Sequence, residues 1–585
     1  MIATLNNRYR SALDLSGVWH IAFDADASGR AKGWSNGIDR TQAHAIAVPG
    51  SWNEQLAESG YMNYCGDAWY ETRFYVPDVA TDRNLSLCFG SADFSAAVWV
   101  NGQFAGRSGA AMLPFEVPLD GLVQPGQMAL LVVCVNATLD PDGPTQGITQ
   151  ATYRAEKRPR DEYLPAVRFD FFPFGGLNRP VYLVSKPKAH ICDYTTAISM
   201  TSVAISVEAR GGASVVVRLV REQETVEQHA RLADAKASVG LSPENPALWS
   251  PESPHLYQLG IDLLDSEGAV VDHVSQRIGL RAFSVQGTQL LLNGAPIQLK
   301  GFGKHEESPL HGRGLNLPQL VKDFHLLKWI GANSVRTSHY PYSEAFLDLA
   351  DEFGILVVDE VFSINLDFRL ITDATLANHK AAISELVARD KNRTCVVAWS
   401  LANEPGYLAE PEYAEKSAPY WQSIFAHARA LDPTRLMTHA NVGYAGNDDP
   451  AFAESDIIGL NRYHGWYSEP AQLDRATQRL RDDFDAVAAH GKPIVLFEFG
   501  ADAMAGQHAS YDQMFTEEYQ ARFIEAYWAE IEAHPAVAGG HIWNFADFRT
   551  AQHGRRVVHN LKGVFTRTRE PKMAAWAIRR LWGAA

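Results

Sequence analysis

Two glutamates lie at the ends of apolar runs of strand length, and a pair of carboxyl groups is what acid–base or nucleophilic chemistry requires. Glu404 follows the run VVAWSLAN, and Glu498 stands near the end of the run PIVLFEFG. Glycoside hydrolysis uses one carboxyl group to protonate the leaving oxygen and a second to attack the sugar or to activate water. Retaining enzymes hold the two groups about 5 to 5.5 Å apart, so the fold must bring these two positions together.

Each glutamate also has a purely structural interpretation. The sequence Asn403-Glu404-Pro405 could begin a helix, with Asn403 as the N-cap and Glu404 near the positive end of the helix dipole. Glu498 could belong to a buried ion pair that only stabilises the fold. The catalytic hypothesis therefore depends on whether the chain forms a fold in which both positions share one site.

The C-terminal half of the chain predicts such a fold, a (β/α)8 barrel. After about residue 282, eight apolar runs alternate with stretches that carry apolar residues at helical spacing. Barrel active sites lie at the C-terminal ends of the strands, and every predicted strand ends in polar residues. In strand order these are His305, Glu306 and Glu307; Arg336 and His339; Asp359 and Glu360; Asn403 and Glu404; His439 and Asn441; Asn461, Arg462 and Tyr463; Glu498; and Trp543, Asn544 and Asp547.

The first 281 residues carry strand signals without intervening helices. Residues 1–184 contain short apolar runs broken by Gly, Pro and Asn turns, which predicts a jelly-roll-like β-sandwich of the sugar-binding kind. Residues 185–281 continue the pattern over the length of one immunoglobulin domain, which predicts an immunoglobulin-like sandwich. Residues 282–585 form the predicted TIM barrel, so the chain of 585 residues is expected to have three domains.

Composition and charge exclude several classes of function. Hydrophobic residues make up 46% of the chain, which is too apolar for a mainly disordered protein. The 52 Lys and Arg against 68 Asp and Glu give a net charge of −16, which argues against nucleic acid or a membrane as a partner.

Cysteine usage and targeting signals indicate the compartment. The five cysteines show no C-x-x-C pair or disulfide framework, so we expect reduced thiols. No recognisable metal-ligand spacing or Gly-rich phosphate loop is present, and we expect neither a metal nor a cofactor. The absence of an N-terminal apolar h-region and of a membrane-length apolar run leads us to expect a cytoplasmic protein.

Several segments resemble glycoside hydrolase family 2, and most closely its bacterial β-glucuronidases. They are GFGKHEES (301–308), WIGANSVRTSHYPYSEAFLDLADEFGILVVDE (329–360), ARDKNRTCVVAWSLANEP (388–405), LNRYHGWY (460–467), FEFGAD (497–502) and WNFADF (543–548). The resemblance extends over essentially the whole chain. It implies a retaining enzyme that releases β-D-glucuronic acid from β-D-glucuronides, as a homo-oligomer and often a tetramer.

The same resemblance assigns roles to individual residues. It implies that Glu404 is the acid/base, that Glu498 is the nucleophile and that Asn403 binds the sugar 2-hydroxyl. Further matched positions bind the sugar: His339, Tyr463, Tyr467 and Trp543 line its site, and Asp170, in FDFFPFGGLNRPV, reaches it from the first sandwich.

A basic loop after the eighth strand offers a partner for a sugar carboxylate, which must be paired when it leaves water. The stretch from Arg549 to Lys572 is rich in Lys and Arg and contains one acid, Glu570. By the resemblance, Asn560-Leu561-Lys562 matches the Asn-x-Lys motif of uronate-specific members of the family, and Arg556 matches a nearby basic position. The alternative interpretation is a solvated basic loop without a ligand.

Two departures from the family pattern leave the exact uronic acid open. Phe499 stands where we expect Tyr, and Val558-His559 stands where we expect two glycines. A β-galacturonidase or a mixed uronidase would use the same carboxylate partners, and a non-catalytic carbohydrate-binding protein would use the same fold. The segment after Glu360 is short compared with related gut enzymes, so we expect an open barrel mouth that admits small-molecule or oligosaccharide aglycones.

Overall fold

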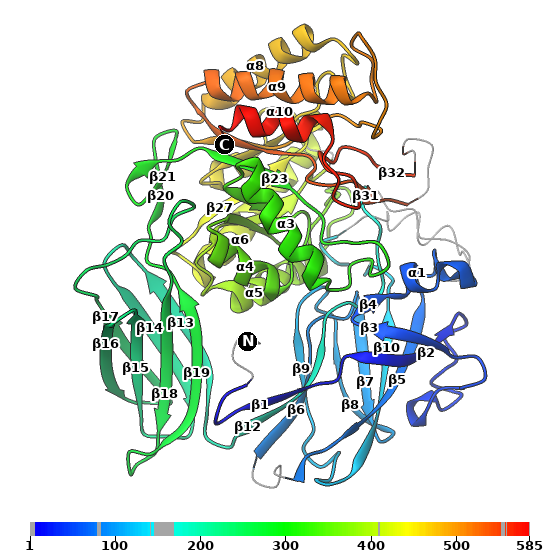
Figure 1. Ribbon diagram of the computed structural model, residues 1–585, viewed down its shortest axis with the longest axis vertical. Helices are drawn as coiled ribbons and strands as arrows, with labels where there is room; N and C mark the ends of the chain where they lie inside the picture. Colours follow the sequence, from blue (N-terminus) through cyan, green and yellow to red (C-terminus); the bar gives the residue numbers. More distant parts are fainter. Residues whose placement is uncertain are drawn as a thin grey trace.

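The computed structural model describes residues 6–78, 83–140, 142–145, 169–406, 410–551, 556 and 558–583. Two β-sandwiches lie side by side below a closed barrel, with the first sandwich in blue and the second in green (Figure 1). The predicted fold class of two sandwiches followed by a TIM barrel is confirmed.

The first sandwich packs a four-stranded sheet, in the order β1-β12-β6-β9, against a six-stranded sheet, in the order β3-β2-β5-β10-β7-β8. A third, two-stranded sheet pairs β11 with β4. The strands are β1 Ser11–Asp14, β2 Gly17–Asp24, β3 His44–Val48, β4 Gly50–Ser51, β5 Asp67–Tyr75, β6 Arg83–Phe89, β7 Ser95–Val100, β8 Gln103–Ser108, β9 Phe115–Pro118, β10 Met128–Asn136, β11 Gly176–Leu177 and β12 Val181–Pro187. Short helical turns accompany them at Trp34–Asn36, α1 Trp52–Gln55 and Ala57–Tyr61.

The second sandwich has the seven strands expected of an immunoglobulin-like domain, in sheets of order β13-β14-β17 and β16-β15-β18-β19. In one strand, VAISVEAR, buried and exposed residues alternate without a break, which is why a period of two places its apolar side chains in the core. The strands are β13 His190–Ile198, β14 Val203–Arg210, β15 Ser214–Arg221, β16 Glu224–Arg231, β17 Lys236–Leu241, β18 Tyr257–Leu264 and β19 Val270–Ile278.

The barrel closes through eight parallel strands, all of which coincide with the predicted apolar runs. They are β23 Leu299–Gly303, β24 Ser334–Arg336, β25 Leu356–Glu360, β26 Val396–Asn403, β27 Leu436–Asn441, β28 Ile458–Asn461, β29 Ile494–Phe499 and β30 Val537–Ile542. Every residue of β26 is buried, as expected of a strand that faces the barrel interior on one side and the helices on the other.

Helices follow the barrel strands at the predicted stretches, and additional short elements occur that the sequence pattern did not predict. The helices are α3 Leu317–Ile330, α4 Glu344–Phe353, α5 Asp373–Asp390, α6 Pro411–Leu431, α8 Leu473–Ala488, α9 Glu517–Ala533 and α10 Met573–Leu581. The unpredicted elements are β20 Phe283–Gln286, β21 Gln289–Leu292, β22 Ala295–Pro296, a 3-10 turn at Gly443–Ala445, α7 Ala451–Glu454, β31 Phe548–Arg549 and β32 His559–Asn560. They are two to four residues long, which is too short for a periodic signal.

Buried ion pairs join the first sandwich to the start of the barrel. Arg313 contacts Asp93 at 3.2 Å, and Arg179 contacts Glu306 at 3.1 Å. Phe171 of the sandwich packs on His305, which follows β23. These contacts fix the segment around residue 170 over the carboxyl ends of the barrel strands.

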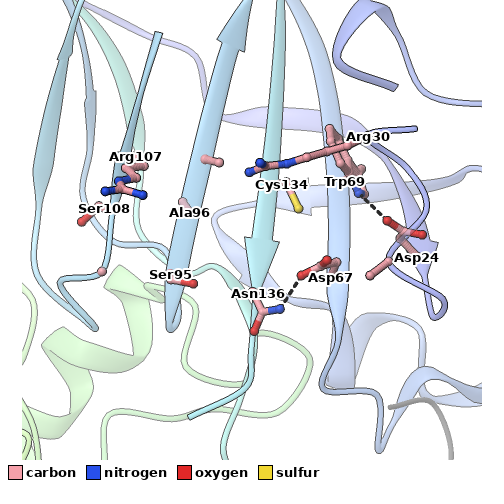
Figure 2. A pocket seen from close by; sticks show the side chains of 13 residues that line it. Asp24, Arg30, Asp67, Trp69, Ser95, Ala96, Arg107, Ser108, Cys134 and Asn136 are labelled. Carbon is pink, nitrogen blue, oxygen red and sulfur yellow. Dashed lines mark hydrogen bonds between the residues drawn. The ribbon is translucent and has the colours of Figure 1, made fainter. Parts of the chain in front are cut away.

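The first sandwich also has a hollow of about 550 Å³ on its six-stranded sheet (Figure 2). Asp24 and Asp67 lie along it, and both already accept side-chain hydrogen bonds, from Trp69 and Asn136 respectively. No residue of this hollow belongs to the strand ends of the barrel, so it is separate from the predicted site.

The five cysteines form no disulfide; Cys192 is exposed and the other four are buried. Among the described residues, no helix is long and apolar enough to cross a membrane.

Candidate active site

A buried guanidinium connects the strand ends where the two predicted catalytic glutamates lie. Arg336, the last residue of β24, is fully buried. Its Nη1 donates to Oε2 of Glu360 at 2.6 Å and to Oδ1 of Asn403 at 3.4 Å, while its Nη2 donates to Oε1 of Glu498. One side chain thus links the ends of β24, β25, β26 and β29.

Glu498 lies on β29 and is 4% exposed. Besides the Arg336 guanidinium, it accepts a hydrogen bond of 2.7 Å from the hydroxyl of Tyr463, and Nε2 of His339 lies 3.6 Å from its Oε1. A carboxylate that accepts from a guanidinium and a phenol is held in one orientation and stabilised in its ionised form. Glu498 is therefore placed as a fixed carboxylate at the barrel mouth.

Glu404 directly follows β26 and has different partners. Its Oε1 accepts from the amide of Asn461 at 2.9 Å, and its backbone takes a left-handed conformation with φ of 51°. The nearest following helix, α6, begins only at Pro411. The alternative interpretation of Asn403 as the N-cap of a helix is therefore wrong, because the chain leaves the strand in an irregular turn.

Burial raises the pKa of both glutamates, because each ionised form loses solvating water. At Glu498 the Arg336 guanidinium acts against this rise, the charge of Glu404 adds to it, and the Tyr463 hydrogen bond opposes it. Among the described residues, Glu404 accepts one side-chain hydrogen bond, from a neutral amide. A cation and a phenol stabilise an anion better than an amide does, so the partners of Glu498 favour its ionised form more than the partner of Glu404 does, although burial raises the pKa of Glu498 to about 8.

Three other predicted sugar-binding residues lie around these carboxyl groups. Nδ1 of His339 donates to Oε1 of Glu360 at 2.8 Å, and the His339 ring stacks on Trp543 with the ring centroids 5.0 Å apart. Asn403 is 3% exposed, and its Oδ1 accepts from Arg336 and from Asn461. No acceptor for its Nδ2 is present among the residues that the structure describes, so this amide is free to meet a ligand hydroxyl.

The basic loop contributes three predicted residues, two of which, Arg556 and Asn560, contact Asp170 of the first sandwich. Arg556 donates to both oxygens of Asp170, at 2.7 and 2.6 Å, and to the hydroxyl of Tyr467 at 2.8 Å. Nδ2 of Asn560 donates to the same carboxylate. Lys562 is 1% exposed and lies 3.2 Å from the Tyr467 hydroxyl. The interpretation of this part as a solvated basic loop is wrong, because Asn560 and Lys562 are buried.

All eleven residues predicted for the site fall within the described part of the chain, and they form two linked groups. One group surrounds the catalytic pair and the other surrounds the basic loop, and Tyr463 and Tyr467, in T-shaped contact at 5.2 Å, connect them. Residues 552–555 and 557 of the basic loop lie outside the described residues.

Four residues of this arrangement were absent from the predicted site. Arg336, Glu360 and Asn461 stand at strand ends, a signal that the sequence pattern did contain. Asp502 lies three residues beyond β29 and pairs with Lys562, and no spacing rule pointed to it. Among the described residues, no group of three or more His, Cys, Asp or Glu side chains is arranged to hold a metal ion.

Comparisons with known proteins agree with this geometry. Residues 13–187 match the family model for the sugar binding domain of glycosyl hydrolases family 2, residues 188–281 match that for glycosyl hydrolases family 2, and residues 283–585 match that for the TIM barrel domain of the same family. A Paenibacillus borealis β-glucuronidase is 37% identical over 98% of this chain and 97% of its own length. The human β-glucuronidase is 34% identical over 98% of this chain and 91% of its own.

Solved structures give the same result. A Ruminococcus gnavus β-glucuronidase superposes with a TM-score of 0.91 at 34% identity, covering 100% of this chain and 99% of its own. The same enzyme in complex with D-glucuronic acid superposes with a TM-score of 0.90, covering 99% of each chain at 34% identity.

Proposed function

Because this chain belongs to glycosyl hydrolases family 2, we propose that it is a retaining β-glucuronidase, which releases β-D-glucuronic acid from β-D-glucuronides. One observation carries this proposal: buried Glu498 and partly buried Glu404, which have unequal partners, lie at the carboxyl ends of two strands of the same barrel, β29 and β26. The Nζ of buried Lys562 lies 5.8 Å from the ring of Tyr463, a partner of Glu498. The proposal takes its substrate from the similar enzymes and its chemistry from this arrangement.

In the first step, an oxygen of Glu498 forms a bond to the anomeric carbon of the sugar. The bond from that carbon to the aglycone oxygen breaks, and Glu404 gives its proton to the departing oxygen. Arg336 and Tyr463 hold the attacking carboxylate ionised and oriented. A covalent glycosyl-enzyme and a free aglycone result.

In the second step, Glu404, now an anion, takes a proton from water. The water oxygen bonds to the anomeric carbon, and the ester bond to Glu498 breaks. Both glutamates return to their starting forms, and the sugar leaves with its original β-configuration. Asn403 supplies an amide for the sugar 2-hydroxyl, where hydrogen bonds strengthen in the transition state.

The sugar carboxylate meets Lys562, Asn560 and Arg556 in this proposal. Lysine supplies a charge with three donors, and asparagine and arginine supply directed donors. Asp170 accepts from a ring hydroxyl, and Trp543, His339 and Tyr467 line the sugar. A galacturonide differs from a glucuronide only at one ring hydroxyl, so β-galacturonidase or mixed activity remains the second candidate function.

A panel of p-nitrophenyl β-glycosides tests the proposal. We expect kcat/KM for the glucuronide to exceed the values for the galactoside and glucoside by several orders of magnitude, with the galacturonide between them. A higher kcat/KM for the galacturonide than for the glucuronide would identify the protein as a β-galacturonidase. No turnover of any glycoside would favour a carbohydrate-binding protein. NMR of the first product distinguishes retention from inversion.

We further propose a cytoplasmic homo-oligomer, with the tetramer of the family resemblance as the first expectation. Five cysteines without a disulfide, as reducing compartments keep them, support the compartment. Light scattering of the purified protein measures the oligomeric state, and cell fractionation tests the compartment. We also expect the enzyme to accept aglycones that range from small molecules to oligosaccharides. A series of glucuronides with aglycones of increasing length tests this expectation.

A further inference from the structure

Asp502 occupies the point where the strand of the proposed nucleophile meets the proposed uronate-binding motif. It lies four residues after Glu498 on the continuation of β29 and is 2% exposed. Both of its oxygens are in use: Oδ1 accepts from the backbone N–H of Leu561 at 2.8 Å, and Oδ2 contacts Nζ of Lys562. The Asp502 carboxylate therefore fixes the positions of the Leu561 backbone and the Lys562 ammonium group.

The backbone around Asp502 is tied to the same motif. The N–H of Ala503 donates to the carbonyl of Leu561 at 3.0 Å, so that residues 502–503 and 561 form two reciprocal contacts. Asp502 therefore holds the main chain of the motif as well as the side chain of Lys562. Displacement of Asp502 would move both together.

Lys562 has little else that could fix its ammonium group. The rings of Trp466 and Tyr467 lie 4.9 and 4.8 Å from its Nζ, and the Tyr467 hydroxyl lies 3.2 Å away. Aromatic faces attract a cation but define its position loosely, whereas a carboxylate defines a direction and a distance. Among the described residues, Asp502 is the one carboxylate paired with Lys562.

The charges of this group sum to zero before any ligand arrives. Lys562 and Arg556 are positive, and Asp502 and Asp170 are negative, with Arg556 also 3.6 Å from Asp502. Burial raises the pKa of Asp502, but Lys562 and Arg556 outweigh that effect and leave its pKa below the ordinary value. Because the group has no net charge, a sugar carboxylate is attracted through directed contacts rather than through an overall positive field.

We propose that Asp502 is a positioning residue for uronate selection: it holds the Lys562 ammonium through one donor and, with a second donor on the Tyr467 hydroxyl, leaves the third directed at the sugar carboxylate. This inference rests on the proposed function. If Asp502 positions Lys562, its neutralisation lowers the glucuronide-to-glucoside ratio of kcat/KM. If Asp502 only balances charge, the same change raises that ratio. In that case its neutralisation would leave the group with a net charge of +1 and would strengthen the binding of an anionic sugar.

A double-mutant cycle tests the proposal. We would measure kcat and KM for an aryl β-glucuronide and for the matched aryl β-glucoside in wild type, Asp502→Asn, Lys562→Ala and the double variant. We expect Asp502→Asn to lower the glucuronide-to-glucoside ratio of kcat/KM about tenfold or more, mainly through a higher KM for the glucuronide. In the Lys562→Ala background, the same change should alter the ratio less than twofold, because residues that act through one contact are not additive.

Asp323 provides a matched control. It is buried on α3 and pairs with Lys304 at 3.0 Å and with Arg569, near the end of the basic loop, at 2.8 Å, and neither partner belongs to the group of Asp502, Lys562, Arg556 and Asp170. Asp323→Asn should lower the melting temperature and leave the substrate ratio unchanged. If Asp502→Asn does not fold, Asp502→Glu, which keeps the carboxylate, and Asp502→Ser carry the same cycle, and Glu should retain more of the selectivity than Ser.

Two results would overturn the inference about Asp502: an unchanged ratio, which includes equal losses with both substrates, or a ratio that rises. Additive effects of the two substitutions would also overturn it. A wild-type protein that does not cleave the glucuronide would refute the proposed function itself and this inference with it, so the two failures are distinguishable.

Discussion

Replacement of Arg336 by lysine tests how the proposed nucleophile stays ionised. Arg336 spans Glu360 and Glu498 with two nitrogens of one planar group. Lysine has a single nitrogen and no fixed fork, so it cannot keep both contacts in the same geometry. We expect it to remain with Glu360, which also holds His339 and Ser400, and to leave Glu498 without its charged donor.

The size of the effect follows from the lost contact. A hydrogen bond to a charged group contributes about 1.5 to 3 kcal/mol, and about 1.4 kcal/mol corresponds to one pKa unit. In the wild type, burial raises the pKa of Glu498 to about 8 and Arg336 opposes that rise, so loss of Arg336 raises the pKa further, by about one to two units. Glu498 must be ionised to attack, so activity is lost below its pKa. The acid limb of the kcat/KM profile should therefore move to higher pH by about the same amount.

The assay is a pH profile of kcat/KM for an aryl glucuronide, together with the melting temperature of each variant. Glu360→Gln provides a comparison of opposite sign: it leaves the contact of Arg336 with Glu498 but removes a negative charge that raises the pKa of Glu498, so its acid limb should move to lower pH. The position of the acid limb does not depend on how much of the sample is folded. A variant with reduced activity and an unmoved acid limb would refute the role given to Arg336.

Four further outcomes are expected. Glu498→Gln should abolish turnover with little loss of binding, and azide should rescue Glu498→Ala to an α-glycosyl azide; near wild-type turnover in a preparation free of host enzyme would remove the nucleophile assignment. Glu404→Ala should slow substrates with poor leaving groups far more than activated aryl glycosides. It should also abolish the alkaline limb of the pH profile, since that limb reports the loss of the proton of Glu404. Equal losses across a leaving-group series would contradict this role. Lys562→Ala should cost the glucuronide about two to four decades in kcat/KM, from roughly 3 to 5 kcal/mol for an unpaired buried charge, while the glucoside changes much less; the same factor for both would assign Lys562 to loop structure alone. Val558→Gly should raise the free energy of unfolding by about 0.5 to 1 kcal/mol. Val558 has a φ of 69°, and the backbone strain of a β-branched residue in that conformation exceeds the entropy cost of glycine. A lower melting temperature of the variant would show that Val558 is not strained.

Much of the fold was determined by local pattern. The eight parallel strands and their long helices carry apolar patterns over many residues, and these patterns can be recognised without knowing how the side chains pack. The short elements, α7 and β20 to β22, were missed because two to four residues contain no period. The same pattern placed polar residues such as Arg336 and Glu360 at the strand ends, although it could not say which of them would touch.

The sequence by itself determined the residue types of the site and, through the family resemblance, their expected roles. It could not determine pairing, because pairing depends on distances between segments far apart in the chain. Arg556 and Asn560 meet Asp170 across nearly four hundred residues of chain, and only the docking of the first sandwich on the barrel creates that contact. Glu404 and Glu498 are the same residue type, each at the end of a strand. They differ because Glu498 accepts a hydrogen bond from a guanidinium and Glu404 accepts one from an amide. Tertiary structure alone assigned those partners.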